Sequence, residues 1–172
     1  MSKRLNFNLL NLYPRSLVTI PGMEFRLAQI SAGRKLAVLI SPDSKLITEV
    51  RGETSKYGDC SSILCPLHTH NANSLRNRLP WLKPQLLRLK SSAGKGDRMG
   101  IATPGHVQAM RHFKGKVTPS FAQQSIREMK RTAHNPQQVM DDPTRSIFEK
   151  GWHDGVGAEA DHLKIFQDIH IV

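Results

Sequence analysis

Cysteine is scarce in this 172-residue chain, which contains only Cys60 and Cys65. Two cysteines argue against a disulfide scaffold, and their scarcity suits a reducing compartment. Long apolar runs are also missing, because no stretch approaches the roughly 20 residues that a membrane-spanning helix needs. The first residues lack the long apolar core and the small-residue cleavage site of a signal peptide. We therefore expect a cytoplasmic protein with no membrane segment.

Acidic residues are few, since 14 Asp and Glu stand against 25 Lys and Arg, for a formal net charge of +11. Such an excess favours an anionic partner, which can be nucleic acid, an acidic membrane surface or an anionic metabolite. The cations are spread from Lys3 to Lys164 without a run of five or six, which is typical of a solvated surface. Aromatic residues are sparse, none lies in an RNP-like pattern, and no helix carries a basic stripe. A basic nucleic-acid-binding module is therefore the alternative hypothesis rather than the leading one.

Hydrophobic residues make up 38% of the chain, which is enough to bury a core. Residues 16–53 contain short runs rich in Val, Ile and Leu, separated by Gly, Pro and Ser turn residues. Short connections predict an antiparallel meander of about four strands, at 16–20, 24–30, 35–40 and 47–53. Residues 54–68 indicate a Ser/Cys/Gly loop, and residues 71–82 a short helix that Pro80 ends or kinks.

From about residue 86 the pattern changes to strands that alternate with helices. Residues 86–92 predict a strand before a glycine-rich loop, and Thr103 followed by Pro104 predicts a helix with Thr103 as its N-cap. We expect further strands within 116–124 and 155–163, a helix over 125–132, and one or two helices within 135–152, where Asp142-Pro143 restarts helical character. This alternation indicates a parallel β/α architecture.

A cluster of metal-ligand side chains occurs early, with Cys60, Cys65, His68 and His70 within eleven positions. Structural zinc sites usually have two ligand pairs separated by a dozen or more residues. The spacing therefore favours an ordinary loop with buried thiols over a zinc site.

The glycine-rich loop at 92–106 lies between a predicted strand and a predicted helix. Such a loop can bring backbone N–H groups and a helix N-terminus close to an anion. The spacing matches neither a P-loop nor GxGxxG, so a tight structural turn is an equal alternative. In the same way, Asp97 and Arg98 can be an ion pair that holds the loop.

Gln123, Gln124 and Ser125 follow a predicted strand, at the end where active sites lie in parallel β/α folds. Amides there commonly bind sugar hydroxyls. The alternative is a capping cluster for the next helix.

The sequence GAEADHLK, residues 157–164, places Glu159, Asp161, His162 and Lys164 on a short apolar strand. Charges in such a place are costly unless they are paired, hydrogen-bonded or metal-bound. Twist at the end of the strand allows Asp161 and His162 to reach a common site, although strand alternation separates them. The structural alternative is an Asp161–Lys164 or Glu159–His162 pair that fastens the strand.

Three stretches together resemble the tagaturonate epimerase family: GKGDRMGIATPGHVQAM, PSFAQQSIREMKRT with PQQVMDD, and GAEADHLK. The family pattern reads approximately GFGDRLGLATPGH, then FAQQSIRE–RT–VMDD, then FGADADHLK. The likeness covers about residues 60–164, and its motifs are long and collinear. Lys95 and Val156 stand where the family has an aromatic residue, Glu159 replaces an aspartate, and Pro143 interrupts a helix that usually continues.

The resemblance implies a metal-dependent sugar-acid isomerase with a barrel-like β/α catalytic region, which interconverts D-tagaturonate and D-fructuronate. The expected fold is α/β, with an antiparallel β-rich lead-in over 1–85 and the opening βα units of an incomplete TIM-like barrel over 86–172. By the same resemblance Asp161 is the general base and His162 a ligand of a divalent metal cation. Weaker substrate-binding candidates are Asp97, Arg98, Gln123, Gln124 and Lys164, with Lys164 facing the substrate carboxylate.

One route that fits the resemblance is retro-aldol cleavage, in which a base removes the hydroxyl proton at the carbon to be inverted. A divalent metal would stabilise the enediolate until re-addition. Family members are more than twice as long, and their later strands supply further ligands and a second acid or base. We therefore expect a truncated chain with negligible activity, whose uncovered apolar faces promote self-association.

Overall fold

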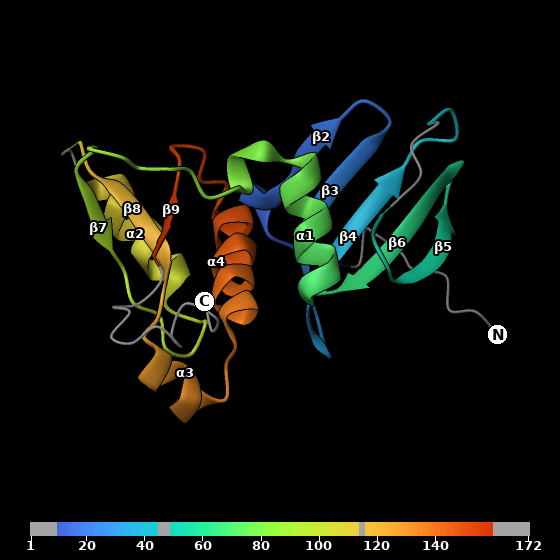
Figure 1. Cartoon of the computed structure of the whole chain (residues 1–172). Helices are drawn as coiled ribbons and strands as arrows, with labels where there is room; N and C mark the ends of the chain where they lie inside the picture. Colours follow the sequence, from blue (N-terminus) through green and yellow to red (C-terminus); the bar gives the residue numbers. More distant parts are fainter. Residues whose placement is uncertain (1–9, 45–48, 114–115, 160–172) are drawn as a thin grey trace. The chain divides into compact units, whose positions relative to one another are not determined.

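The computed structural model describes residues 10–44, 49–113 and 116–159. These residues fall into two compact units. The first unit holds the described residues up to Ser74 together with Phe148–Gly151, and the second holds Leu75–Ile147 and the described residues from Trp152 onward. Each unit contains one β-sheet (Figure 1).

The first unit is built on an antiparallel sheet with the order β1-β3-β4-β6-β5, and β2 also pairs with β3 (Figure 1). Its strands are β1 Asn11–Leu12, β2 Val18–Ile20, β3 Met23–Ile30, β4 Gly33–Ile40, β5 Glu53–Tyr57 and β6 Cys60–Pro66. The prediction of antiparallel strands from short connections is confirmed. The predicted runs at 16–20, 24–30 and 35–40 correspond to β2, β3 and β4.

Both faces of this sheet carry buried apolar side chains. The register aligns Leu27, Leu36 and Cys65 across three strands on one face, each at most 1% exposed. On the other face Ala28, Ala37 and Leu64 form a smaller buried cluster, against which five partly buried side chains pack: Leu10, Leu12, Ile30, Leu39 and Tyr57. Burial on both faces explains why β3 and β4 lack strict hydrophobic alternation.

The predictions for 47–53 and for 54–68 are wrong in the described residues. Residues 49–52 are not in a strand, and the supposed loop is the hairpin of β5 and β6. Its serines belong to the ladder, because Ser55 and Ser62 are cross-strand partners whose hydroxyl oxygens are 2.7 Å apart. Gly58 supplies the positive φ of 57° that the turn requires.

Helix α1, Thr69–Arg78, confirms the predicted helix, which ends before Pro80, the first residue of the short 3-10 turn η3, Pro80–Leu82. Within the first unit Asn71 is 1% exposed, and its amide fixes the start of α1. Its Oδ1 accepts from the backbone N–H of Arg51, while its Nδ2 donates to the carbonyls of Arg51 and Pro66. These bonds also explain why the connection before β5 is not a strand.

The second unit has a parallel three-stranded sheet, β7-β8-β9, with β7 Ser92–Gly94, β8 Thr118–Gln123 and β9 Gly157–Glu159. Helix α2, Thr103–His112, connects β7 to β8, and the helices α3, Ile126–Thr132, and α4, Pro136–Lys150, connect β8 to β9 (Figure 1). The predicted parallel β/α architecture is confirmed for these elements. The predicted strand at 86–92 is wrong, because β7 begins only at Ser92 and Leu89 is fully exposed.

Helix α4 runs unbroken through Pro143, so the one or two helices predicted within 135–152 are a single helix, and the expected interruption at Asp142-Pro143 is wrong. A proline inside a helix costs a backbone hydrogen bond. Side-chain contacts hold the helix around it: Arg76 donates to Asp141, at 2.8 Å, and to Thr144, at 2.7 Å. Tertiary contacts therefore override the local signal of the proline.

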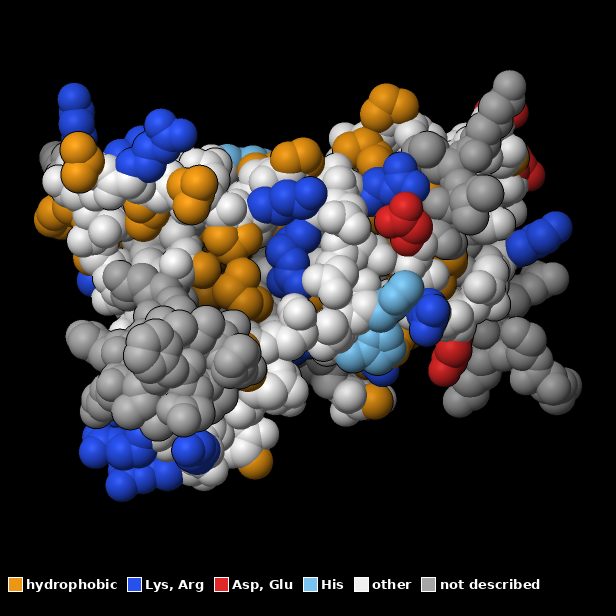
Figure 2. All heavy atoms as spheres, in the orientation of Figure 1, with side chains coloured by type: hydrophobic (Ala, Val, Ile, Leu, Met, Phe, Trp, Pro, Cys, Tyr) orange, Lys and Arg blue, Asp and Glu red, His pale blue; other side chains and the backbone are white. Residues whose placement is uncertain are grey.

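The surface is dotted with Lys and Arg side chains, which outnumber acidic ones in the face drawn in Figure 2, as the net charge predicts. Among the described residues, no helix has the length and apolar character needed to cross a membrane.

Candidate active site

The carboxyl ends of the three parallel strands lie at one edge of the sheet. Gly94 is the register partner of Ser120 on β8, and Gln123, the last residue of β8, is the partner of Glu159 on β9. A pocket of about 510 Å³ opens beside the ends of β7 and β8. Its lining comes from the loop after β7, from β8 and from α3: Gly96, Asp97, Arg98, Met99, Ile101, Ala102, Gln123 and Glu128. Active sites lie at this end of parallel strands.

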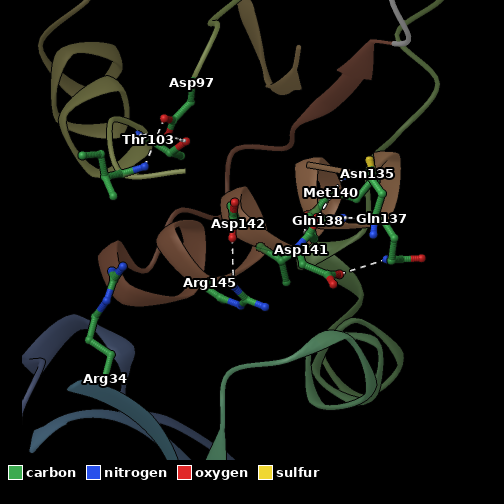
Figure 3. Close-up of polar contacts among 12 residues, drawn as sticks. Arg34, Asp97, Thr103, Asn135, Gln137, Gln138, Met140, Asp141, Asp142 and Arg145 are labelled. Atoms are coloured by element: carbon green, nitrogen blue, oxygen red, sulfur yellow. Dashed lines mark hydrogen bonds and ion pairs between the residues drawn. The ribbon is translucent and has the colours of Figure 1, made fainter. Parts of the chain in front are cut away.

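Asp97 shapes the loop between β7 and α2. Its Oδ1 accepts from the backbone N–H of Ile101 at 3.0 Å, and its Oδ2 accepts from the N–H groups of Ala102 and Thr103, each at 2.8 Å. Oδ2 also accepts from the Thr103 hydroxyl at 2.9 Å (Figure 3). The predicted N-cap is therefore wrong: Thr103 is the first residue of the helix, and Asp97 satisfies the N–H groups at its start.

These bonds keep Asp97 ionised. Burial raises the pKa of the Asp97 carboxyl, but hydrogen bonds from Thr103, Ile101 and Ala102 outweigh burial and lower the pKa below its usual value. Both carboxylate oxygens are already occupied by donors of the loop. Contact of Asp97 with substrate stays a prediction, and the geometry gives the side chain a positioning role.

Gly100 allows the same loop to approach helix α4. Its φ is +67°, and a side chain at this position would overlap the carboxylate of Asp142. Burial raises the pKa of Asp142, Arg145 and His134 lower it, and the nearby Asp97 and Asp141 raise it further. Arg145 Nη1 donates to Asp142 Oδ1 at 2.8 Å (Figure 3). The glycine-rich loop is thus a tight structural turn, which was one of the two alternatives for it.

Arg98 does not pair with Asp97, so the interpretation of these neighbours as an ion pair is wrong. Arg98 Nε instead donates to Glu128 Oε1 of helix α3. The Arg98 carbonyl accepts from Nε2 of Gln124, at 2.8 Å, and Gln124 is only 3% exposed. The backbone of Arg98 is therefore anchored from β8, while its side chain, 71% exposed, reaches solvent at the pocket.

The two glutamines after β8 have different surroundings. Gln123 lines the pocket, and the absence of a side chain at Gly96 leaves room for its amide, because a Cβ there would lie 3.0 Å from Gln123 Oε1. Gln124 is buried against the loop, and its Oε1 has no hydrogen-bond partner among the described residues. Ser125 caps helix α3, accepting from the N–H of Glu128, so the capping alternative is confirmed for this residue.

A polar cluster of Arg76, Gln137 and Asp141 stabilises α4, the helix that the glycine-rich loop contacts. Asp141 is fully buried, and its Oδ1 accepts from Arg76 Nη2 at 2.8 Å. The same oxygen accepts from Gln137 Nε2 at 2.9 Å (Figure 3). The sequence analysis missed Arg76, Asp141 and Glu128. Glu128 could have been found from the sequence, because Ser125 and Glu128 form the S-x-x-E pattern of a capping box. No sequence pattern indicates the role of Arg76, since Asp141, to which it donates, is 65 residues away.

Asp161, His162 and Lys164 lie outside the described residues, so their roles stay predictions. Within the described ranges, no group of three or more His, Cys, Asp and Glu side chains could hold a metal ion. Of the four side chains expected in a loop, Cys60 and Cys65 lie on strand β6, and His70 lies in helix α1. The described residues alone therefore do not form a metal centre, and the Asp97 oxygens are occupied by the loop.

A family model for tagaturonate epimerase, UxaE, matches residues 13–172. The chain belongs to the tagaturonate epimerase family. The tagaturonate/fructuronate epimerase of Thermotoga maritima is 42% identical to this chain over 109 residues, which are 63% of this chain and 22% of that protein. This assignment confirms the resemblance carried by the three motifs, and it gives no support to the nucleic-acid-binding alternative.

Solved structures of a family member are also similar. The chain matches the fructuronate-tagaturonate epimerase of Cohnella laeviribosi in a two-glycerol complex with a TM-score of 0.82 and 35% identity, covering 95% of this chain and 32% of that one. The native crystal structure of the same enzyme gives a TM-score of 0.81 at 34% identity, covering 94% and 32%. This tagaturonate epimerase family chain thus spans about a third of the length of the solved structures it matches.

Proposed function

We propose that this chain contributes to the active site of an epimerase that interconverts tagaturonate and fructuronate. The observation that carries the proposal is the pocket at the carboxyl ends of β7 and β8, which presents Arg98 and Gln123 beside the end of β9. A guanidinium and an amide suit a small anionic sugar acid rich in hydroxyl groups. The three parallel strands would be the first of a TIM-like barrel that further strands complete.

Asp161 is proposed as the general base, because it follows Glu159, the last residue of β9, by two positions in the sequence and matches the aspartate of the family motif. It would take the proton of the hydroxyl on the carbon that is inverted, which begins cleavage of the neighbouring carbon–carbon bond. Gln123 would hold a hydroxyl of the substrate from the end of β8. Asp97, by fixing the loop, keeps Arg98 at the rim.

His162 is proposed as one ligand of a divalent metal cation, which would stabilise negative charge on substrate oxygens. Since no group of three or more possible ligand side chains occurs within the described ranges, at least part of the ligand set would come from outside them. The test is metal analysis of a chimera in which residues 13–172 replace the corresponding part of the Cohnella laeviribosi enzyme, and of the His162→Ala variant of that chimera. We expect the variant to lose metal, and equal metal content in both would contradict the ligand assignment.

Activity of the 172-residue chain by itself is expected to be negligible. Catalysis needs acid, base and metal together, and the loss of one commonly lowers the rate by about 10² to 10⁴-fold. The measurement is conversion of tagaturonate to fructuronate by the purified chain. Measurable turnover of tagaturonate by the purified chain would contradict this expectation.

A chimera tests the proposed function itself. Residues 13–172 would replace the corresponding part of the Cohnella laeviribosi enzyme, in which 34–35% of the aligned residues are identical. We expect the chimera to epimerise tagaturonate and its Asp161→Asn variant to fold but lose turnover. A folded chimera without turnover, or an Asn variant with full turnover, would refute the proposal.

A further inference from the structure

Arg98 is the single positively charged side chain among the described residues that line the pocket. Its main chain is held by the buried amide of Gln124, so the position of its Cα is fixed. Its side chain is 71% exposed and can change its partner with little loss of packing. The backbone of Arg98 is therefore anchored, whereas its exposed guanidinium lies at the rim of the pocket, where it can change its partner.

Glu128, the partner of Arg98, has a second partner for its other carboxylate oxygen. Oε1 accepts from Arg98, whereas Oε2 accepts from the backbone N–H of Ser125 at 3.2 Å, within the capping box of α3. Glu128 therefore stays ordered and hydrogen-bonded if Arg98 leaves. The pKa of Glu128 is lowered, chiefly by the hydrogen bond from the Ser125 N–H and to a smaller extent by Arg98. The Glu128 carboxylate therefore stays ionised whether or not Arg98 is paired with it.

A guanidinium matches a carboxylate with two parallel N–H donors, which makes arginine suited to recognising an organic acid. An ion pair at the protein surface is weak, because water and salt screen it and side-chain entropy opposes it; in this pair the Arg98 side chain is 71% exposed and that of Glu128 is 20% exposed. The Arg98–Glu128 pair therefore offers an incoming carboxylate a guanidinium that is already positioned and easily released.

We infer that Arg98 is the anchor for the carboxylate of the sugar-acid substrate and that Glu128 holds Arg98 until the substrate displaces it. This assignment rests on the proposed function and deepens it. It gives Arg98, rather than Lys164, the recognition of the acid group. Glu128 would then compete with the substrate carboxylate for Arg98. Removing the charge of Glu128 should therefore strengthen binding of the substrate.

The test compares two sugars that differ at the acid group, D-tagaturonate and the neutral ketohexose D-tagatose, titrated into the 172-residue chain by calorimetry. Arg98→Gln should weaken tagaturonate binding by about 10- to 100-fold, as expected for loss of a hydrogen-bonded charge, and should leave tagatose binding unchanged. Lys164→Gln, the matched loss of one cation, should change tagaturonate binding less than Arg98→Gln does.

Glu128→Gln separates exchange from simple structural support. Glutamine at the same position can still complete the capping box, so helix α3 is kept while the competing charge is removed. We expect this variant to bind tagaturonate several-fold more tightly than wild type, with unchanged affinity for tagatose. A purely structural Glu128 would give equal or weaker binding of both sugars.

Several outcomes would overturn the inference: Arg98→Gln binding tagaturonate as wild type does, Glu128→Gln weakening it, or no saturable binding by the wild-type chain at millimolar sugar. In the chimera, Arg98→Gln should raise KM for tagaturonate more than it lowers kcat. An inactive chimera with the expected binding pattern would refute the proposed reaction and leave the carboxylate anchor standing.

Discussion

Replacing Asp97 with alanine should destabilise the loop that carries Arg98 and the start of helix α2. The Asp97 carboxylate accepts three backbone N–H groups and one hydroxyl, from Ile101, Ala102 and Thr103. Loss of a helix cap costs about 0.5–2 kcal/mol, and loss of a negative charge at a helix N-terminus costs about 0.3–1 kcal/mol. Since the two effects overlap, we expect a loss of about 2 kcal/mol in the free energy of unfolding.

Asp97→Asn should cost about half as much, because asparagine keeps one acceptor oxygen but loses the charge. Its effect should depend on pH. The pKa of Asp97 is lower in the folded protein than the ordinary 3.8, so the ionised carboxylate stabilises the fold above that value. This stabilisation is lost as pH falls through the folded pKa. The difference between wild type and Asp97→Asn should therefore be full at neutral pH and shrink below about pH 4.

The assay is urea unfolding at several pH values, combined with amide hydrogen exchange of Ile101, Ala102 and Thr103. Their exchange should become faster in Asp97→Ala than in wild type at neutral pH. Asp154→Ala, which removes an exposed carboxylate from the same unit, is the control and should change stability by less than about 0.5 kcal/mol. Equal stability of Asp97→Ala and wild type, or a difference for Asp97→Asn that does not change with pH, would refute the reasoning.

Three other substitutions or reactions test the surroundings of the site. Asp141→Asn should lower the free energy of unfolding by about 3–5 kcal/mol, because it removes the buried carboxylate that pairs with the buried Arg76; the double variant Arg76→Met/Asp141→Leu should recover most of this loss in urea unfolding. Gly100→Ala should cost about 1–3 kcal/mol through its positive φ and its overlap with Asp142, whereas Gly105→Ala, with nothing within 4 Å, should be neutral or slightly stabilising. A thiol reagent should label Cys60 but not Cys65 in the folded chain, because burial raises the pKa of Cys65 to about 12; rapid labelling of both would contradict the described sheet.

The elements that sequence predicted correctly are those set by local physics. Short connections between apolar runs fixed antiparallel pairing for β2, β3 and β4, since a parallel pair needs a longer crossover. Alternating strands and helices indicated the parallel sheet of β7, β8 and β9, because each intervening helix supplies the long crossover that parallel strands need. The edge of the sheet where Gln123 lies was also predictable, because parallel strands share their carboxyl ends. The collinear motifs were enough to indicate the family.

The features that sequence could not determine depend on partners far along the chain or on surroundings. The hairpin at 53–66 was taken for a loop because serine hydroxyls, which usually favour turns, are paired across the strands here. Pro143 stays inside α4 because Arg76, distant in sequence, holds the residues around it. Asp97 and Arg98 are adjacent in sequence, yet one closes the start of α2 and the other reaches Glu128 on α3. The residue types of the loop indicate which chemistry it can offer. Only the folded backbone determines that the Asp97 side chain binds the start of α2 and that the Arg98 side chain faces the pocket.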